Sequence, residues 1–293
     1  MTADRALSAR APAKINRELR VGPRRGDGYH DIRSRFVTID LADSLEARAA
    51  ADFSFFCQPD SLPADSSNLV ARAARSLAEA LGIAPHVQLR LSKRVPIGAG
   101  LGGGSADAAV TLRLLCRFWG AEPPEATLAE IAASLGSDVP FFLVGGEADV
   151  GGRGERVEPR DDRASEDLVL LVPPYSISTA EVYAAFDRLG GTVPLSGRLE
   201  IESSGRFFGP NDLERAIVAM RPEMGSLLER GRRIADECAV TGSGSTLVLR
   251  GAEKGGIDAC LAANPGLRAM ACRTVGRAEY RSLTGAREAR SPA

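Results

Sequence analysis

Lysine is scarce in this chain, although charged residues make up 26% of its 293 residues. The lysines are Lys14, Lys93 and Lys254, and arginine supplies the rest of the positive charge. In a chain that uses arginine by default, a retained lysine can mark a position that needs a compact point charge. Genomic base composition explains the scarcity equally well, so the bias is only a hint.

Other features that the sequence lacks exclude whole classes of protein. The net charge is −1, which gives no strong field for nucleic acid. No apolar run approaches the roughly 20 residues of a membrane span, and the first ten residues have no apolar signal segment. The five cysteines include no CxxC pair, so neither zinc nor a disulfide framework is indicated. We therefore expect a cytoplasmic protein with a small-molecule partner, without nucleic acid or membrane, as a monomer or homodimer.

Glycine, by contrast, is concentrated in one stretch. Residues 98–104 contain five glycines, between a strand-like run at 87–91 and a helix-like run at 105–119 with Ser105 as a plausible N-cap. Glycine lets the backbone take positive φ and lets a ligand approach it closely. A helix start adds unpaired N–H groups and the positive end of the helix dipole. The stretch therefore predicts an anion site, most often one for phosphate.

Three common phosphate loops do not fit this stretch. The Walker loop needs Gly-Lys-Ser/Thr, which does not occur here. Residues 98–103 satisfy G-x-G-x-x-G, but the second strand of a dinucleotide-binding fold would fall on Glu122-Pro-Pro-Glu125, which cannot be a strand interior. The His-Arg-Asp and Asp-Phe-Gly motifs of protein kinases are absent.

The order Pro96, three residues, Gly-Leu-Gly-Gly-Gly-Ser-Ala and then a helix resembles the ATP loop of the GHMP kinase superfamily. The resemblance implies an α+β fold of two domains, the first ribosomal-protein-S5-like and the second ferredoxin-like, with the active site in the cleft between them. The polar stretch 151–167 is the best boundary, so we expect an ATP-binding domain over residues 1–160 and a C-terminal domain over 161–293.

Further motifs narrow the resemblance. They stand at residues 12–16 (Pro-Ala-Lys-Ile-Asn), 26–30 (Gly-Asp-Gly-Tyr-His), 136–140 (Gly-Ser-Asp-Val-Pro) and 241–245 (Thr-Gly-Ser-Gly-Ser). In this order they resemble the GHMP branch that phosphorylates the 2-hydroxyl of a diphosphocytidyl methylerythritol in the non-mevalonate isoprenoid pathway, using ATP and Mg²⁺. Two alternatives are a GHMP kinase for another alcohol, favoured if Tyr29 and His30 are buried in the core, and a non-catalytic nucleotide-binding protein.

The resemblance also implies roles for individual residues. Asp138 matches the catalytic acid and Lys14 its partner, a pairing that suits phosphoryl transfer because the reaction needs a proton acceptor and a cation against developing charge. Tyr29 and His30 would bind the cytosine end and Asn16 the substrate, while Ser105 is the candidate Mg²⁺ contact. The implied ATP-binding residues are Pro96, Ile97, Gly98, Ala99, Gly100, Leu101, Gly102, Gly103, Gly104, Ser105, Ala106, Asn68 and Lys93.

Each of these residues also has a purely structural interpretation. Asp138 follows a helix-ending glycine, where turn residues are common, and Asn16 could fix a strand bend. Tyr29 and His30 could be a core pair at a strand start. The remaining alternatives are an N-cap for Asn68 and for Ser105, and a surface charge for Lys93. Residues 241–245 should form a second small loop, in which Gly242 and Gly244 allow packing against the first.

Hydrophobic periodicity predicts a helix over 68–81, because Leu69, Ala73, Leu77 and Leu81 repeat every four residues. We expect residues 1–10 to be a loose arm, residues 139–144 to be a strand and the last dozen residues to be frayed. Arg17 and Glu18 stand where the resemblance implies apolar residues. They should face solvent or pair near the substrate channel.

Overall fold

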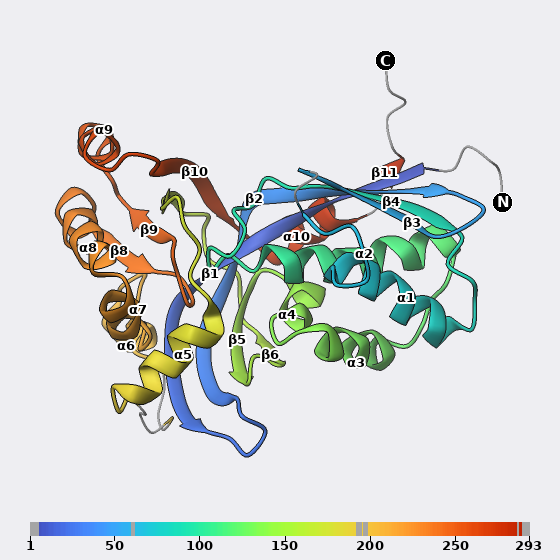
Figure 1. Cartoon of the computed structure of the whole chain (residues 1–293), viewed down its shortest axis with the longest axis horizontal. Helices are drawn as coiled ribbons and strands as arrows, with labels where there is room; N and C mark the ends of the chain where they lie inside the picture. The colour runs from blue at the N-terminus through green and yellow to red at the C-terminus, as the bar shows by residue number, and fades with distance from the viewer. Residues whose placement is uncertain (1–5, 60–61, 192–194, 196–198, 286, 289–293) are drawn as a thin grey trace.

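The computed structural model describes residues 6–59, 62–191, 195, 199–285 and 287–288. A long antiparallel hairpin of β1 (Ala6–Arg24) and β2 (His30–Ala49) runs through the whole molecule (Figure 1). Ala6 to Arg10 pair with residues 44–48 of β2, so the predicted loose arm is wrong for residues 6–10. Backbone pairing along β2 orders a segment whose composition alone does not predict a strand.

β2 is the strand on which the two halves of the sheet meet. Its first part pairs with β5, its middle with β10 and its last part with β4. Through the described residues the main order is β11-β1-β2-β10-β7-β9-β8, and β3, β4, β5 and β6 branch from it. The remaining strands are β3 (Ser54–Gln58), β4 (Val87–Ser92), β5 (Glu147–Gly152), β6 (Arg156–Pro159), β7 (Asp167–Val172), β8 (Glu237–Val240), β9 (Leu247–Arg250), β10 (Arg268–Val275) and β11 (Arg287–Glu288).

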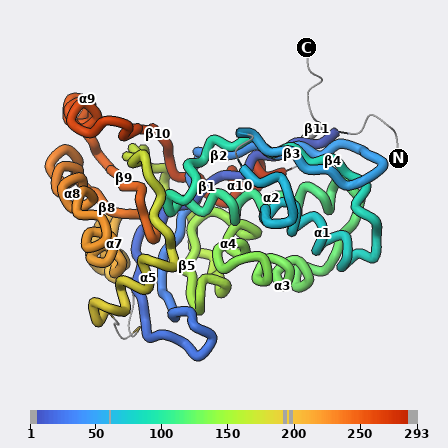
Figure 2. The backbone as a smooth tube through the Cα atoms, in the orientation of Figure 1, coloured from blue at the N-terminus to red at the C-terminus, as the bar shows by residue number. Residues whose placement is uncertain are grey.

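The helices fall into two groups, which Figure 2 shows on either side of the β1–β2 hairpin. One group packs around α2 on the hairpin. It contains α1 (Leu69–Leu81), α2 (Gly103–Trp119), α3 (Glu125–Leu135), α4 (Val139–Val144) and α10 (Arg277–Thr284). The other accompanies β7 to β10 and contains α5 (Thr179–Arg188), α6 (Ile201–Ser204), α7 (Glu214–Met220), α8 (Pro222–Ile234) and α9 (Lys254–Ala262). None of these helices combines the length and the apolar run that a membrane crossing would require.

The helix predicted over 68–81 is confirmed as α1. Its buried residues include Val70, Ala73 and Leu77, which recur at the helical spacing. Asn68 is its N-cap and accepts a hydrogen bond from the Val70 N–H at 3.0 Å. Gly82 ends the helix in the left-handed conformation, with φ 65°.

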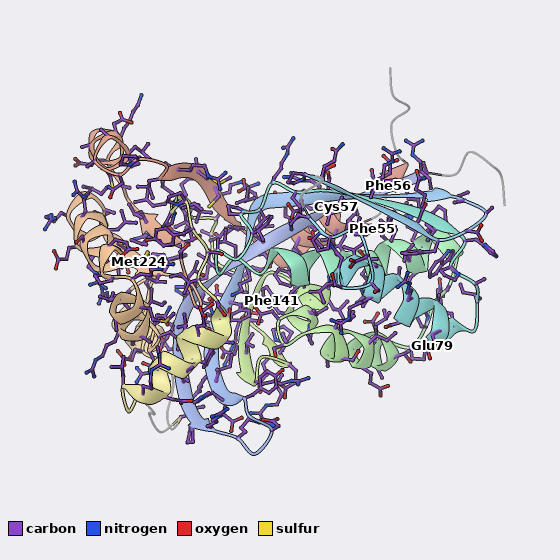
Figure 3. The ribbon with its side chains drawn as sticks, in the orientation of Figure 1. Phe55, Phe56, Cys57, Glu79, Phe141 and Met224 are labelled. Atoms are coloured by element: carbon purple, nitrogen blue, oxygen red, sulfur yellow. The ribbon has the colours of Figure 1, made fainter. Side chains whose placement is uncertain are left out.

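Two local predictions around the site are wrong. α2 begins at Gly103 with Gly102 as N-cap, so Ser105 is inside the first turn rather than capping it. Residues 139–144 form the helix α4, not a strand. A short apolar run does not distinguish a buried strand from a buried helix, and Pro140 in the first turn favours the helix. Phe141 of α4 points into the middle of the molecule (Figure 3).

The C-terminal segment is also more ordered than predicted. Residues 277–284 form α10, which packs on β1 and α2, and β11 pairs with β1. Tyr280 anchors α10, because its buried hydroxyl donates to Phe142 O at 2.5 Å. The remainder of the predicted frayed end, residues 286 and 289–293, lies outside the described residues.

Arg17 and Glu18 are buried instead of facing solvent or the substrate channel. Arg17 Nη1 lies 2.5 Å from Glu147 Oε1, and both side chains are at most 4% exposed. The Glu18 carboxylate accepts the N–H groups of Glu200 and Ile201, each at 3.1 Å. Both charges therefore join β1 to neighbouring segments. The expectation from sequence is wrong because Arg17 pairs with a carboxylate and Glu18 accepts backbone N–H groups, all from residues distant in sequence.

Candidate active site

A cavity of about 550 Å³ lies along the glycine loop. Residues from both sides of the predicted boundary line it, among them Lys14 and Asp138 from the first half and Thr179, Tyr183 and Ser243 from the second. The volume is typical of small-molecule sites, which span about 300–1,000 Å³. The predicted location of the site, a cleft between the two parts of the chain, agrees with this lining.

The glycine loop passes too close to its neighbours for side chains. A Cβ at Gly100, where φ is +79°, would stand 2.4 Å from Thr241 O. A Cβ at Gly102, where φ is +68°, would stand 3.1 Å from Cε of Lys14. The second loop packs directly on the first, and the Thr246 N–H donates to Ala99 O at 3.3 Å. The predicted packing of the two small-residue loops is thus confirmed.

The start of α2 faces the cavity with free backbone donors. The first bond of the helix runs from the Ala106 N–H to Gly102 O, at 2.9 Å, which leaves the N–H groups of the first turn without partners inside the helix. Gly103, Gly104 and Ser105 line the cavity. This arrangement suits an anionic group, because the helix dipole adds to the donors.

Lys14 is held at the cavity wall by its backbone and its side chain. The β1–β2 register shifts between Pro12 and Lys14, and the Lys14 N–H donates to Leu101 O at 3.0 Å. Nζ donates to Asn16 Oδ1 at 2.7 Å and to Gly100 O at 3.2 Å. The backbone and side-chain hydrogen bonds therefore hold this ammonium group against the glycine loop.

Asp138 completes an ion pair with Lys14. Its Oδ2 lies 3.5 Å from Lys14 Nζ, and the two side chains are 31% and 5% exposed. Asp138 stands at the N-cap position of α4 but makes no side-chain cap bond, which leaves its carboxylate directed at the cavity. Burial lowers the pKa of Lys14, while Asp138 acts in the opposite direction. The charge on the ammonium therefore depends on the carboxylate beside it.

A second charged cluster joins β2, the end of β4 and the first turns of α2. Lys93 Nζ is 2.5 Å from Asp43 Oδ2 and 2.7 Å from Asp107 Oδ2, and all three side chains are at most 8% exposed. Asp43 also accepts the backbone N–H groups of Arg94 and Val95. Burial raises the pKa of Asp107 to about 8, although Lys93 acts in the opposite direction. Lys93 lines the cavity, but its ammonium is already engaged by the side chains of Asp43 and Asp107.

The other residues implied to bind ATP or substrate differ in whether they line the cavity. Pro96 to Ser105 all line the cavity, and so does Asn68, which also caps α1. Ala106 is completely buried and lies behind the loop. Asn16 is also absent from the lining, because its amide is engaged by Lys14, by Ser34 at 3.0 Å and by Thr241 at 3.3 Å. Asn16 therefore holds Lys14 in place, a role that neither the predicted substrate contact nor the predicted strand bend describes.

Tyr29 and His30 do not line the main cavity. Tyr29 is 51% exposed in the turn between β1 and β2, and His30 is 5% exposed. His30 Nδ1 contacts Gly22 O at 2.8 Å. Its Nε2 lies 3.1 Å from Asp187 Oδ1 without a hydrogen bond. Because Tyr29 is exposed, the condition that would favour another alcohol, burial of both residues, is not met.

Sequence reasoning missed the cavity residues Thr179 and Tyr183 on α5, whereas Ser243 lies in the predicted second loop. Thr179 Oγ1 and Ser243 Oγ are 2.8 Å apart, which joins α5 to the second loop. The Tyr183 ring lies 5.4 Å from the His30 ring, and burial raises the pKa of its hydroxyl, with Asp138 adding to the effect. Ser178 to Glu181 have capping-box spacing, which is a sequence signal for the start of α5, but nothing local indicates that α5 faces the cavity.

Comparison with known proteins assigns this chain to a superfamily. Residues 68–146 match the model of the GHMP kinases N terminal domain. A mevalonate kinase structure, at 13% identity and a TM-score of 0.63, covers 92% of this chain and 99% of its own, and shares the fold. A homoserine kinase structure from Cytophaga hutchinsonii does so at 16% identity and a TM-score of 0.69, over 98% of each chain. With its glycine loop and paired lysine and aspartate, the molecule is an α+β protein of the GHMP kinase superfamily.

Relatives with higher identity narrow the assignment. A 4-diphosphocytidyl-2-C-methyl-D-erythritol kinase from Nocardioides sp. is 40% identical over 82% of this chain and 86% of its own length. Its counterpart from Streptomyces avermitilis is 37% identical over 92% and 95%. A crystal structure of a 4-(cytidine 5'-diphospho)-2C-methyl-D-erythritol kinase is 33% identical, with a TM-score of 0.75 over 92% and 99%. The chain belongs to the 4-diphosphocytidyl-2-C-methyl-D-erythritol kinase family.

Proposed function

We propose that this chain phosphorylates the 2-hydroxyl of 4-diphosphocytidyl-2-C-methyl-D-erythritol, with ATP as co-substrate, in the non-mevalonate route to isoprenoid precursors. The observation that carries the proposed mechanism is the Lys14–Asp138 pair, 3.5 Å apart on the wall of the cavity that the glycine loop also lines. Phosphoryl transfer requires positioning and charge stabilisation more than covalent help from the protein. This cavity holds groups suited to both tasks.

Asp138 is the proposed acceptor for the proton of the alcohol. It is the more exposed member of the pair, so a substrate hydroxyl can reach it. Lys14 is the proposed cation beside the transferred phosphoryl group, because its Nζ also contacts Gly100 O of the loop that would hold the nucleotide. A positive charge within about 4–6 Å also favours the ionised form of a carboxylate.

The free N–H groups at the start of α2 are the proposed contacts for the ATP phosphates. Mg²⁺ is expected to arrive with these phosphates, and it would neutralise their developing charge. Among the described residues no three His, Cys, Asp or Glu side chains form a ligand set. Mg²⁺ commonly takes most of its ligands from phosphate and water, and Ser105 on the cavity wall is the candidate protein contact.

The cytosine end of the substrate is proposed to bind around His30. Tyr183 connects His30 to the main cavity, because it lines that cavity and its ring lies beside the imidazole. His30 Nε2 is buried and makes no hydrogen bond, with Asp187 Oδ1 3.1 Å away, so a base edge that pairs with it would lie beside this carboxylate. An aromatic face that stacks on a base contributes about 1–3 kcal/mol. Tyr29 at the rim is the second candidate for stacking.

Substitution of the tyrosines tests this assignment. Tyr29→Ala and Tyr183→Ala should each raise KM for the cytidine substrate about tenfold or more, because one lost stacking contact is worth about 1–3 kcal/mol. KM for ATP should stay within about twofold, and Tyr183→Phe, which keeps the aromatic face, should stay near the original value. Steady-state kinetics with each substrate varied separately measures these effects. Equal weakening of ATP and substrate would contradict the pocket.

The activity itself is tested by coupled ADP release over a panel of alcohols. The diphosphocytidyl compound should give the highest kcat/KM, and removal of its cytidine should reduce kcat/KM strongly. Highest turnover with another alcohol would reassign the substrate. ATP binding without ADP release from any alcohol would indicate a non-catalytic nucleotide-binding protein.

The predicted division into residues 1–160 and 161–293 remains a proposal, supported by cavity walls that come from both parts. A cytoplasmic location is proposed on the basis of the five cysteines, which are odd in number and include no CxxC pair, so that no disulfide framework is indicated. Free thiols are typical of reducing compartments.

A further inference from the structure

The side chain of Asn211 holds the second small-residue loop, residues 241–245. Its Nδ2 donates to Val240 O at 2.9 Å and to Gly242 O at 2.8 Å. Its Oδ1 accepts the Leu213 N–H at 3.0 Å. An asparagine amide has two donor hydrogens and one acceptor oxygen. Both donors are therefore used on the loop, and the acceptor is used on the segment that carries Asn211.

That segment is fixed to β1. The Leu19 N–H donates to Pro210 O and the Asp212 N–H donates to Leu19 O, both at 2.9 Å. The Asp212 carboxylate also accepts the Val21 N–H at 2.9 Å. The amide of Asn211 is thus presented to the loop from a segment that is tied to the central hairpin.

Asn211 contacts the loop from the side away from the active site. It lines a separate cavity of about 530 Å³, which has no lining residue in common with the active-site cavity over the described part of the chain. Gly242 and Ser243, in contrast, line the active-site cavity. The Gly242 carbonyl that Asn211 holds therefore faces away from the active site.

The orientation of one peptide group follows from this contact. The bond between Gly242 and Ser243 is trans, so its C=O and N–H groups point in opposite directions. Because the carbonyl is turned to Asn211, the Ser243 N–H points toward the active-site cavity. Among the described residues it has no backbone acceptor. The loop therefore offers a free donor to the cavity.

This donor stands beside the proposed catalytic pair. A Cβ added at Gly242 would lie 3.5 Å from Lys14 Nζ and 3.2 Å from Asn16 Oδ1. The Thr241 hydroxyl accepts the Asn16 N–H at 2.9 Å, so the loop between β8 and β9 rests on β1 (Figure 1). An N–H group and an ammonium group on the same part of the wall both stabilise negative charge that develops there.

The same peptide group would lose this orientation easily without a partner. Gly242 has φ +56°, and glycine reaches other backbone conformations at little cost because it has no Cβ. A rotated peptide would turn the Gly242 carbonyl toward Lys14, where it would compete with phosphate for the ammonium group. The hydrogen bond from Asn211 favours the orientation that is found, because it satisfies the carbonyl on the far side.

We propose that Asn211 is a positioning residue for phosphoryl transfer, which turns the peptide between Gly242 and Ser243 so that the Ser243 N–H donates to the transferred phosphoryl group. This inference rests on the proposed function, which brings that group beside Lys14. Asn211 acts through the loop and not by contact with a substrate.

Kinetics of two variants tests this role. Asn211→Ala removes both donors and should lower kcat about tenfold, less than the roughly 10²–10³-fold loss that follows outright removal of an oxyanion donor. Asn211→Asp keeps the shape but sets a carboxylate against two carbonyl oxygens, so it should lower kcat further. KM for ATP should stay within about threefold in both, as expected when an interaction made in the transition state is lost.

Asn264→Ala is the matched control. Asn264 also uses its amide on a backbone carbonyl, Cys260 O at 2.7 Å, but it follows α9 and does not line the active-site cavity. It should lower the melting temperature about as much as Asn211→Ala does and leave kcat unchanged. Unchanged kcat per folded molecule in both Asn211 variants would overturn the proposal, and so would an equal loss of kcat in Asn264→Ala.

Crystal structures test the geometry independently of turnover. In Asn211→Asp the Gly242 carbonyl should face Lys14. In the unsubstituted chain with ADP and orthovanadate, a vanadate oxygen should lie within about 3.2 Å of Ser243 N. An unrotated peptide in Asn211→Asp would overturn the proposal even in an active kinase. A rotated peptide in a chain that releases ADP with no alcohol would overturn the proposed function but support the control of the loop by Asn211.

Discussion

Lys14 and Asp138 differ in burial, and that difference suits the separate roles proposed for them. The ammonium is packed against Asn16, the glycine loop and the Phe36 ring, 4.5 Å away. Phe36 is supported in turn by Phe141, with ring centroids 5.2 Å apart. The carboxylate is half-buried on the cavity wall. A fixed cation beside an accessible base is the arrangement that proton removal and phosphoryl transfer require.

Replacement of Asp138 by asparagine should lower kcat by about 10²–10⁴-fold, the usual contribution of a positioned general base. Asparagine keeps the shape of the side chain but cannot take the proton. KM for ATP should change little, since the glycine loop remains intact. ADP-release kinetics measures both, and turnover near the original value would remove Asp138 from the mechanism.

The raised pKa of Asp107 predicts that the stability of the protein depends on pH. Its folded pKa is raised by burial to about 8, whereas an unfolded aspartate titrates near 3.9. Between these values the folded state keeps a proton that the unfolded state has released, so stability falls as pH rises through this window. Asp107→Asn cannot titrate and should lack this loss, which amounts to at most roughly 1.4 kcal/mol per pH unit. Urea unfolding of both proteins from pH 5 to 9 measures it, and parallel curves would contradict the prediction.

The two small-residue loops act as one unit at the scale of elements. Residues 98–104 and 241–245 touch through backbone atoms, which explains why both are built from small residues. The first loop continues into α2 and the second joins β8 to β9. Contact between the loops therefore connects the two halves of the cavity wall, and loss of this contact should affect nucleotide binding and folding together.

Gly100→Ala should destabilise the protein by roughly 2–4 kcal/mol, because it combines a left-handed backbone with overpacking. The added Cβ would stand 2.4 Å from Thr241 O, which as a backbone atom cannot rotate away. Gly104→Ala is the matched control for stability. Its Cβ would have its nearest neighbour at 3.7 Å, and it lies within a helix, where alanine is favoured. Thermal unfolding compares them, and equal melting temperatures would contradict the expectation.

At the scale of the whole molecule, the chain crosses between its two halves more than once. β10 pairs with β7 through residues 268–273 and with β2 through residues 274–275. The chain then returns through α10 and β11 to pack on β1. Strand pairing and helix packing therefore cross the predicted boundary near residue 160.

We therefore expect the two halves to unfold together. Trp119 is the single tryptophan and stands at the end of α2 in the first half, so its fluorescence reports on that half. Far-ultraviolet circular dichroism reports on the whole chain. Denaturant midpoints from the two probes should coincide, as they do in a two-state transition. Two separate transitions would show that the halves are energetically independent.

The sequence by itself determined the local features of this protein. The sequence predicted the glycine loop, the helix α1 with its caps, and the residue types of the paired lysine and aspartate. Each of these features depends on neighbouring residues in the chain. Tertiary structure decided what local patterns cannot contain: the helical state of residues 139–144, the burial of Arg17 and Glu18, and the presence of Tyr183 in the cavity. Arg17, Glu18 and Tyr183 meet partners more than 100 residues away, and α4 packs on α2 and α3. The burial that fixes these features exists only once the chain has folded.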